Sequence, residues 1–137
     1  MEIKNPADDE IKKILSMYRV VAVVGLSDRP VRASFGVASF LKGEGYRIVP
    51  VNPNIESVLG EKCYPSLSAI PFAIDIVDVF RRSEAVPPIA YEAVSIGARV
   101  LWLQLGVTAD ESVMRHKDQI KIISDRCIKM EYSRLLG

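Results

Sequence analysis

The chain has 137 residues, of which 49% are hydrophobic and 26% charged, which indicates one folded domain and excludes a disordered chain. Its 18 basic and 17 acidic residues give a formal net charge of +1, so the basic excess of a nucleic-acid-binding protein is absent. The charged N-terminus MEIKNPADDE is unlike a signal peptide and no apolar run reaches membrane-spanning length, so we expect a cytoplasmic protein with no membrane partner.

The first 18 residues predict a helix that packs on a sheet. Asn5 suits the N-cap of this helix and Pro6 its first position. Apolar side chains then recur at helical spacing and define one face of the helix: Ile11, Ile14, Leu15 and Tyr18.

A strand, a glycine and a helix start come next. The apolar run Val20–Val24 predicts a buried strand, which ends at Gly25. After a loop that carries arginines, Ser34 opens a helix that stops at Gly43 or Gly45. This order is typical of a phosphate cradle, because backbone N–H groups at a helix start are unpaired and the helix dipole favours an anion there.

Four more strands are predicted, at Tyr46–Val51, Ala73–Phe80, Arg99–Gln104 and Gln119–Ser124. The segment between the first two of these has no long helical pattern. We expect a loop there, with an extended piece at Glu61–Tyr64 and one helical turn at Ser66–Ile70.

Two helices separate the later strands. The first has Pro87 and Pro88 in or just before its first turn and stops at Gly97. A T-x-x-E pattern, from Thr108 to Glu111, predicts a capping box for a second helix that ends near residue 116.

Strands that alternate with helices predict an α/β fold with a parallel sheet covered on both faces. We expect a doubly wound, five-stranded parallel Rossmann-like sheet in a single domain over residues 1–137, with strand order 3-2-1-4-5. Ligands of such sheets bind beyond the carboxyl ends of the strands. Polar or glycine clusters fall at these ends: Gly25–Ser27, Asn52–Pro53, Phe80–Arg82, Gln104–Gly106 and Asp125–Cys127.

The motifs of common nucleotide sites are incomplete. Ser27 replaces the second glycine of the dinucleotide fingerprint, and Asn52 stands where its acidic residue belongs. NAD is therefore disfavoured, and NADP less so because basic residues lie nearby. The Walker A pattern is absent, and the only histidine, His116, is expected on a helix away from the strand ends, which argues against a Ser-His-Asp centre.

Seven segments instead resemble the small, stand-alone CoA-binding proteins, whose Rossmann-like domain is similar to the CoA-binding domain of the succinyl-CoA synthetase α subunit. The resemblance covers nearly the whole chain, and its most specific part is the succession of DVFRR, WLQ-x-GV and DRC. The segments are GLS at 25–27, RPVRASFG at 29–36, VPVNP at 49–53, GEKCYPSL at 60–67, DVFRRSEAV at 78–86, WLQLGV at 102–107 and DRCIKMEYSRL at 125–135.

The resemblance implies binding of coenzyme A or a small acyl-CoA at the carboxyl ends of the strands, with no catalytic residue and no metal. Gly25, Ser27 and the loop to Ser34 would cradle phosphates, and a guanidinium there can hold two phosphate oxygens. The residues that the resemblance assigns to CoA are Gly25, Leu26, Ser27, Arg32, Ser34, Phe35, Asn52, Pro53, Val79, Phe80, Arg81, Gln104, Gly106, Arg126 and Cys127.

Several candidate residues also have a purely structural explanation. Gly25 can be a tight turn, Arg32 a solvated loop residue and Asn52 an Asx turn before proline. Trp102, inside an apolar strand, is expected in the core, and Arg126 can simply pair with its neighbour Asp125.

Two adjacent arginines end the third predicted strand. We expect Arg81 and Arg82 to face different ways, one toward the ligand and the other toward an acid such as Asp78 or Glu84.

The two cysteines, Cys63 and Cys127, lack metal-type spacing with a histidine and are expected as reduced thiols. Cys127 can be a buried small hydrophobe, or it can lie near the CoA thiol and form a mixed disulfide with it. Cys63 is expected to be the less reactive of the two.

Three functions stay open at this point. The first is a CoA-binding module without a self-contained catalytic centre, because no general base is recognisable beside a nucleophile. The second is a non-catalytic part of a multi-subunit acyl-CoA ligase, and the third is an NAD(P)-binding regulator. A homodimer or a ligase-like partner subunit is compatible with the first two.

Overall fold

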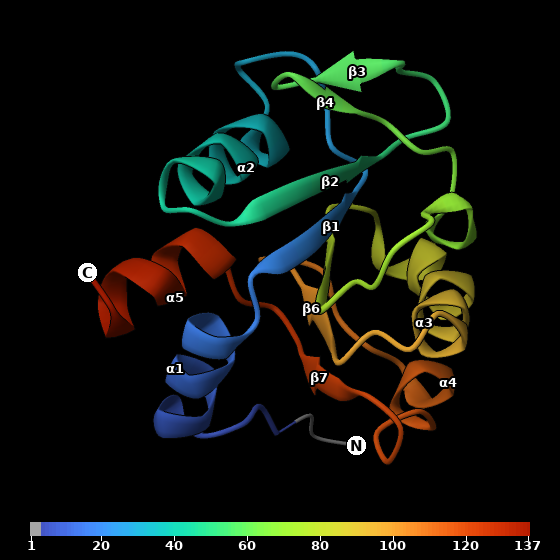
Figure 1. Cartoon of the computed structure of the whole chain (residues 1–137). Helices are drawn as coiled ribbons and strands as arrows, with labels where there is room; N and C mark the ends of the chain where they lie inside the picture. The colour runs from blue at the N-terminus through green and yellow to red at the C-terminus, as the bar shows by residue number, and fades with distance from the viewer. Residues whose placement is uncertain (1–3) are drawn as a thin grey trace.

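A five-stranded parallel sheet stands between two layers of helices in this computed structural model, which describes residues 4–137 (Figure 1). The strands are β1 (Val20–Val24), β2 (Arg47–Val51), β5 (Ile76–Val79), β6 (Val100–Leu103) and β7 (Lys121–Ile123). The helices are α1 (Asp8–Met17), α2 (Ala33–Gly43), α3 (Val86–Ser95), α4 (Glu111–Met114) and α5 (Ile128–Leu135). The expected doubly wound α/β fold is confirmed.

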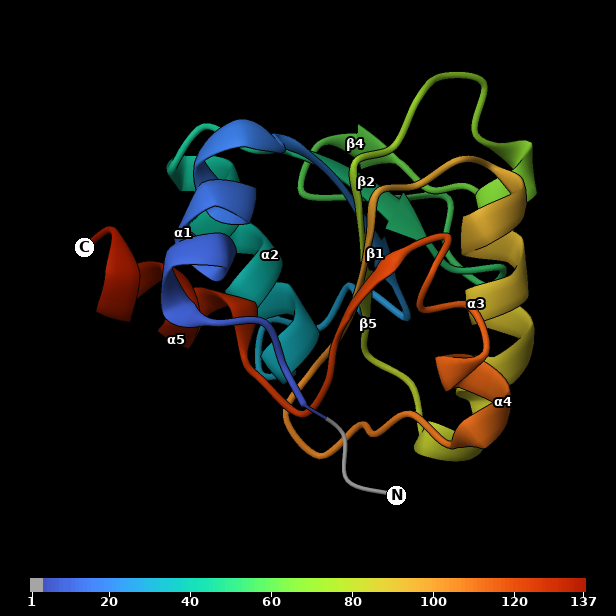
Figure 2. The same cartoon turned by 90° about the horizontal axis from the view of Figure 1, so that it is seen from below.

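The two helical layers lie on opposite faces of the sheet. Seen from below, α1, α2 and α5 stand on one side of the strands and α3 and α4 on the other (Figure 2). Alternate residues of each strand face alternate layers, so that Val21 and Val23 join one buried cluster and Ala22 and Val24 the other. Each face of the sheet therefore has its own hydrophobic core, which explains the unbroken apolar strands.

Trp102 is the largest fully buried side chain and lies in the core beneath α1, α2 and α5, as expected. Its indole Nε1 donates a hydrogen bond to the carbonyl oxygen of Arg126 at 2.8 Å. The core of this face is thereby tied to the segment between β7 and α5.

The predicted strand order is wrong. The observed order is β2-β1-β5-β6-β7, so that β1 pairs with β2 on one side and with β5 on the other, and β2 is an edge strand. Pro50 lies inside β2 and has no N–H group to donate to a ladder, which confines a strand to an edge. An order with β2 between two partners would require that missing donor.

A small hairpin covers part of the free edge of β2. It consists of β3 (Ser57–Val58) and β4 (Glu61–Lys62), and β3 was not expected. Beyond it, the N–H of Tyr64 donates to the carbonyl of Pro50 and the N–H of Asn52 donates to the carbonyl of Tyr64, both at 2.9 Å. The predicted extended piece is therefore confirmed, as is the helical turn, which is η1 at Leu67–Ala69.

Two predicted helix caps, Asn5 and Thr108, are wrong, because each of these residues is hydrogen-bonded to a residue far along the chain. The amide of Asn5 accepts from the N–H of Ser124 and donates to its carbonyl, at 2.8 and 2.9 Å, and α1 begins only at Asp8. The N–H of Thr108 donates to the hydroxyl of Ser83 at 3.0 Å. The cap of α4 is Asp110, whose carboxylate accepts from the N–H of Val113.

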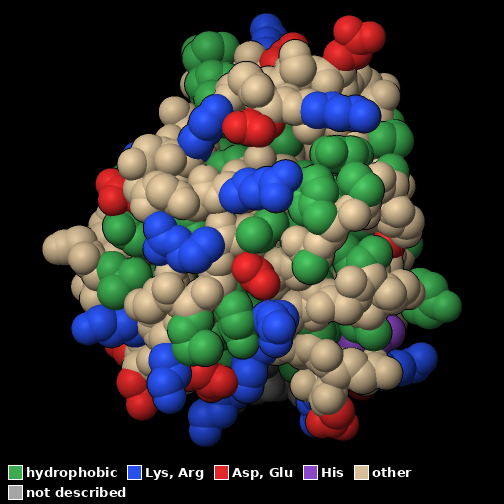
Figure 3. Space-filling model, viewed as in Figure 1, with side chains coloured by type: hydrophobic (Ala, Val, Ile, Leu, Met, Phe, Trp, Pro, Cys, Tyr) green, Lys and Arg blue, Asp and Glu red, His purple; other side chains and the backbone are tan. Residues whose placement is uncertain are grey.

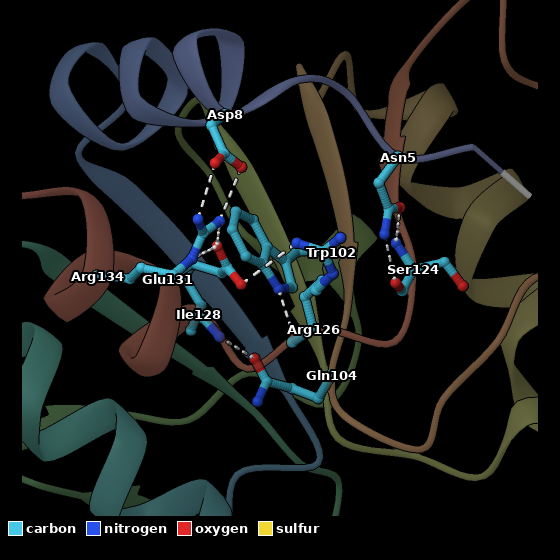
Figure 4. A network of polar contacts seen from close by, with 9 residues as sticks. All are labelled: Asn5, Asp8, Trp102, Gln104, Ser124, Arg126, Ile128, Glu131 and Arg134. Atoms are coloured by element: carbon cyan, nitrogen blue, oxygen red, sulfur yellow. Dashed lines mark hydrogen bonds and ion pairs between the residues drawn. The ribbon is translucent and has the colours of Figure 1, made fainter.

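Helix α5, which the sequence did not predict as a separate element, is held by an ion-pair network (Figure 4). Arg134 donates two hydrogen bonds to the carboxylate of Asp8, both 2.8 Å long, and also contacts Glu131. Glu131 in turn accepts from Arg126 at 3.3 Å. The hydrogen bonds from Arg134 lower the pKa of Asp8, so the carboxylate of Asp8 stays charged to a lower pH than usual.

Charge is otherwise spread over the surface. On the face drawn in Figure 3, Lys and Arg side chains are interspersed with acidic and apolar ones rather than gathered in one patch. Among the helices of residues 4–137, none is long and apolar enough to cross a membrane.

Candidate functional site

Gly25 joins the carboxyl ends of three strands. Its N–H donates to the carbonyl of Val51 in β2 at 2.9 Å, and a Cβ added at Gly25 would lie 2.5 Å from the carbonyl oxygen of Phe80, next to β5. Its φ of +86° is also one that residues with side chains rarely adopt. The glycine is therefore required by the fold, whatever it contributes to a ligand.

The loop after Gly25 is braced by two serines. The N–H of Ser27 donates to the hydroxyl of Ser34 at 3.0 Å, and the hydroxyl of Ser27 accepts from the N–H of Arg29 at 3.1 Å. The side chain of Leu26 is fully buried, and its carbonyl accepts from the amide of Asn52. These contacts hold the loop in place and occupy the N–H groups of Ser27 and Arg29.

Helix α2 begins without a side-chain cap. Its N-cap residue is Arg32, and no acidic residue lies in its first turn. Within residues 4–137, the N–H groups of Ala33 and Ser34 have no hydrogen-bond acceptor. An uncapped helix start of this kind attracts an anion, because its orphan donors and the helix dipole act together.

An apolar cleft of about 640 Å³ lies between the start of α2, the ends of β5 and β6, and the start of α5. The side chains that contribute to it are mostly apolar, with Arg81, Arg82 and the amide of Gln104 as the polar exceptions. Two of its apolar side chains, Leu105 and Met130, are more than 60% exposed. Exposed apolar side chains around a cleft indicate a surface that a ligand or partner covers.

A second, more polar pocket of about 440 Å³ lies at the ends of β1 and β2. Asn52, Pro53, Ser66 and Glu92 are among the residues that line it. Asn52 forms the Asx turn considered above, because its side-chain oxygen accepts from the N–H of Asn54 at 2.9 Å. The carboxylate of Glu92 is engaged by the first residues of η1.

Arg81 lines both the cleft and the polar pocket and thus connects them. Arg82 lines the cleft as well, but not the polar pocket. Like Arg29 and Arg32, both are exposed and form no ion pair with any residue in the range 4–137. Within the described part of the chain, this end of the sheet therefore carries four arginines that form no ion pair.

Asp78 does not pair with either arginine, contrary to the expectation. It lies on β5 between Val23 and Trp102, is fully buried, and neither carboxylate oxygen has a hydrogen-bond partner in the described part of the chain. Burial raises the pKa of Asp78 well above its usual value. Glu84 makes no ion pair within residues 4–137 either.

Gln104 and Cys127 meet on one side of the cleft. The side-chain oxygen of Gln104 accepts from the N–H of Ile128 at 3.1 Å, while its nitrogen points away from that bond (Figure 4). Cys127 is half-buried at the N-cap position of α5. Nearby, the N–H of Gly106 donates to the carboxylate of Asp125 at 2.7 Å, so Asp125 and Arg126 do not pair with each other.

The predicted site residues thus divide into two groups. Eight line the cleft or the polar pocket: Gly25, Asn52, Pro53, Phe80, Arg81, Gln104, Gly106 and Cys127. The others lie outside both: Leu26 and Val79 are buried in the cores, Phe35 packs against one core, Ser27, Arg32 and Ser34 belong to the loop and the start of α2, and Arg126 pairs with Glu131.

Some lining residues were not predicted. Met130 was not predicted because it lies on α5, which was not expected. Val37 was not predicted because the sequence does not show which residues on the apolar face of α2 border the cleft and which lie in the core. Leu105 lies between two predicted residues, and its position just after a strand end could have indicated that it lines the site.

Comparison with known proteins gives one family and several relatives. The sequence profile of the family described as CoA binding domain matches residues 19–133. The uncharacterized protein YneT of Bacillus subtilis is 44% identical over 132 residues, which is 96% of this chain and 98% of that protein. Acetate–CoA ligase [ADP-forming] II of Archaeoglobus fulgidus is 35% identical over 81 residues, but these are 58% of this chain and 12% of the ligase.

The solved structures agree with these sequence relatives. A hypothetical protein from Pyrococcus horikoshii OT3 superposes with a TM-score of 0.93 and 37% identity, and the alignment covers 100% of both chains. The strand order and the helical layers described above are therefore those of an experimentally known structure.

Proposed function

The chain belongs to the CoA-binding domain family, and on this premise we propose that it binds coenzyme A, or a small acyl-CoA, at the carboxyl ends of its strands. The relation to acetate–CoA ligases supports the same cofactor, although the chain corresponds to a small part of those enzymes. The proposal is limited to binding. Among residues 4–137, no histidine or carboxylate lines the cleft beside Cys127, so the cleft offers no nucleophile with an adjacent base.

The observation that carries the proposal is the joining of a polar pocket and an apolar cleft at Arg81. CoA has the same two-part character, because an adenine nucleotide is linked through a pyrophosphate to a long, weakly polar pantetheine arm. The nucleotide suits the polar pocket at β1 and β2, and the arm suits the cleft toward α5. The pyrophosphate then lies where the two meet.

Cations and free amides at this junction match the phosphates of CoA. Arg81 and Arg82 form no ion pair within residues 4–137, and a guanidinium can hold two phosphate oxygens at once. The uncapped start of α2 adds two free N–H groups, those of Ala33 and Ser34. Asn52, in place of an acidic residue, adds no negative charge to the polar pocket, and the carboxylate of Glu92 there is engaged by N–H groups of η1.

Calorimetric titration of the ligand-stripped protein with CoA, dephospho-CoA and NADP tests the proposal. We expect CoA to bind at micromolar concentration or tighter and NADP at least tenfold more weakly, a difference of about 1.4 kcal/mol. Thermal unfolding gives an independent check, since a ligand at 100 times its Kd stabilises the folded protein by about 2.7 kcal/mol. Equal or tighter binding of NADP would overturn the proposal, and so would the absence of CoA binding.

A further inference from the structure

We propose that Cys127 is a covalent capture site, at which the cysteine thiol exchanges with the disulfide form of CoA and retains one CoA as a mixed disulfide. This inference rests on the proposed function, because it needs the pantetheine arm in the cleft. The CoA thiol stands at the far end of that arm from the phosphates. Cys127 lines the same cleft as Arg81, but from the α5 side.

An independent observation indicates that this part of the cleft receives a ligand. Gln104 is only 4% exposed, and the N–H of Ile128, which can only donate, fixes the side-chain oxygen of Gln104 as its acceptor. The amide nitrogen of Gln104 is left without an acceptor among residues 4–137, and Figure 4 shows it directed away from α5. In this range only the carboxylate oxygens of Asp78 are buried without a partner, so the Gln104 nitrogen is not sealed in the core but open to the cleft, where a ligand can accept its hydrogen bond.

The pantetheine arm provides such an acceptor, because it carries two amide carbonyls. The side-chain oxygen of Gln104 accepts from the N–H of Ile128, the residue that follows Cys127, and both Gln104 and Cys127 line the cleft. A ligand chain that offers its carbonyl to Gln104 therefore passes close to the thiol of Cys127.

The surroundings of Cys127 are electropositive, which suits a disulfide ligand that carries phosphates. Cys127 stands at the positive end of the eight-residue helix α5, and the guanidinium groups of Arg81 and Arg82 line the same cleft. Cys63 differs on each point. It directly follows β4 and is buried, and burial together with the nearby charge of Asp28 raises its pKa, so it serves as the internal control.

The exchange balances without any further oxidant. The Cys127 thiol loses a proton, and its sulfur attacks one sulfur of CoA disulfide. The S–S bond of CoA disulfide breaks as the Cys127–CoA bond forms, and the second CoA leaves as a thiolate that takes up a proton. One disulfide and one thiol enter the reaction, and one disulfide and one thiol leave it.

The test uses the reduced, full-length wild-type protein with CoA disulfide, followed by intact-mass analysis and peptide mapping. We expect one CoA adduct per chain, on Cys127 and not on Cys63. Dithiothreitol should remove this adduct. Cystamine, a disulfide without nucleotide or pantetheine, provides the comparison, and we expect Cys127 to react with it at least tenfold more slowly. Acetyl-CoA, which has no free thiol, should slow the reaction with CoA disulfide in proportion to its occupancy of the cleft.

Each outcome decides between the two proposals. If CoA binds in the calorimeter but Cys127 gives no adduct, or reacts equally fast with cystamine, the capture site is wrong and the proposed function stands. If CoA does not bind, the proposed function fails, and a rate with CoA disulfide no higher than that with cystamine confirms that failure. A Cys63→Ala variant keeps the small apolar volume at position 63 and must still form the adduct, because labelling lost with Cys63 would also overturn the inference.

Discussion

Charged side chains have different roles around α5 and at the carboxyl ends of the strands. Around α5, Arg126 and Arg134 are both bound by Glu131, and Arg134 is also bound by Asp8 at the start of α1. At the strand ends, Arg81 and Arg82 have no anionic partner among residues 4–137. The first region uses charge to hold elements together, whereas the second leaves its cations free.

The second region is held together by its backbone instead. Gly25 brings the ends of β1, β2 and β5 into contact, and the Ser27–Ser34 hydrogen bond braces the loop. The difference separates the charges that belong to folding from those available to a phosphate. Variants in each region should therefore affect different measurements, and the predictions below run from the largest expected effect on folding stability to the smallest.

Gly25→Ala should cause the largest loss of stability, about 3 kcal/mol. The added Cβ would meet the carbonyl oxygen of Phe80 at 2.5 Å, and the positive φ adds a cost of about 1–2 kcal/mol. Urea denaturation measures the change. Gly36→Ala is the matched control, because nothing lies within 4 Å of its added Cβ and a helical alanine is favoured over glycine by about 1 kcal/mol. Equal effects of the two substitutions would show that backbone contact does not hold the strand ends.

Glu131→Gln should destabilise the protein by about 2 kcal/mol. The substitution removes the carboxylate that two arginines share, and Glu131 itself is only 7% exposed. The cost stays below that of a fully buried pair, because Arg126 and Arg134 are partly exposed and can be hydrated. Glu84→Gln, at an exposed position without an ion pair in the described chain, should change stability by less than about 0.5 kcal/mol. A similar loss in both variants would contradict the role given to the network.

Asp78→Asn should stabilise the protein by about 1–2 kcal/mol at pH 7, with no change of shape. Because burial raises the pKa of Asp78 in the folded state, the stability that this group contributes is complete below the unfolded pKa of about 3.9 and is lost as the pH rises toward the folded pKa. Asparagine does not ionise and avoids this loss.

The pH dependence distinguishes this explanation from a simple packing effect. The advantage of Asp78→Asn in urea denaturation should shrink as the pH falls and vanish below about pH 4. The exposed Asp118→Asn provides the control and should show no such trend. An advantage that is constant with pH would mean that Asp78 is not buried as an ionisable group.

The parts of the fold that the sequence predicted are those decided by neighbouring residues. The apolar runs, the glycine after β1, the prolines at the start of α3 and the turn η1 all depend on short-range pattern. The strand order was also within reach, since Pro50 marks β2 as an edge strand. The predicted order is that of the dinucleotide-binding fold, in which the second strand has neighbours on both sides.

The remaining features depend on partners that are distant in sequence. Asn5 and Thr108 have the chemistry of helix caps, but Asn5 binds Ser124 and Thr108 binds Ser83 instead. The pairing of Asp8 with Arg134 spans 126 residues, and no local pattern indicates it. Because α5 was not predicted, the wall of the cleft that Met130 provides was not predicted either.

Arg81→Ala should have the smallest effect on folding and a large effect on binding. Arg81 is exposed and has no ion pair in residues 4–137, so its removal should change stability by less than about 0.5 kcal/mol. Its place between the polar pocket and the cleft should make it a phosphate ligand, and its loss should weaken CoA binding about tenfold or more, since hydrogen bonds to charged groups contribute about 1.5–3 kcal/mol. Arg115→Ala removes an arginine that is also exposed but lines neither pocket, and it should leave the affinity unchanged.

The same Arg81→Ala variant also shows which phosphate is bound. An equal loss for CoA and dephospho-CoA assigns Arg81 to the pyrophosphate, as its place at the junction of the two pockets suggests. A loss confined to CoA assigns it to the 3′-phosphate, because only that group differs between the two ligands. A loss of folding stability above about 1 kcal/mol would instead give Arg81 a structural role like that of the arginines around α5. The distinction between charges that stabilise the fold and charges that bind phosphate would then not hold for Arg81, the residue that lines both pockets.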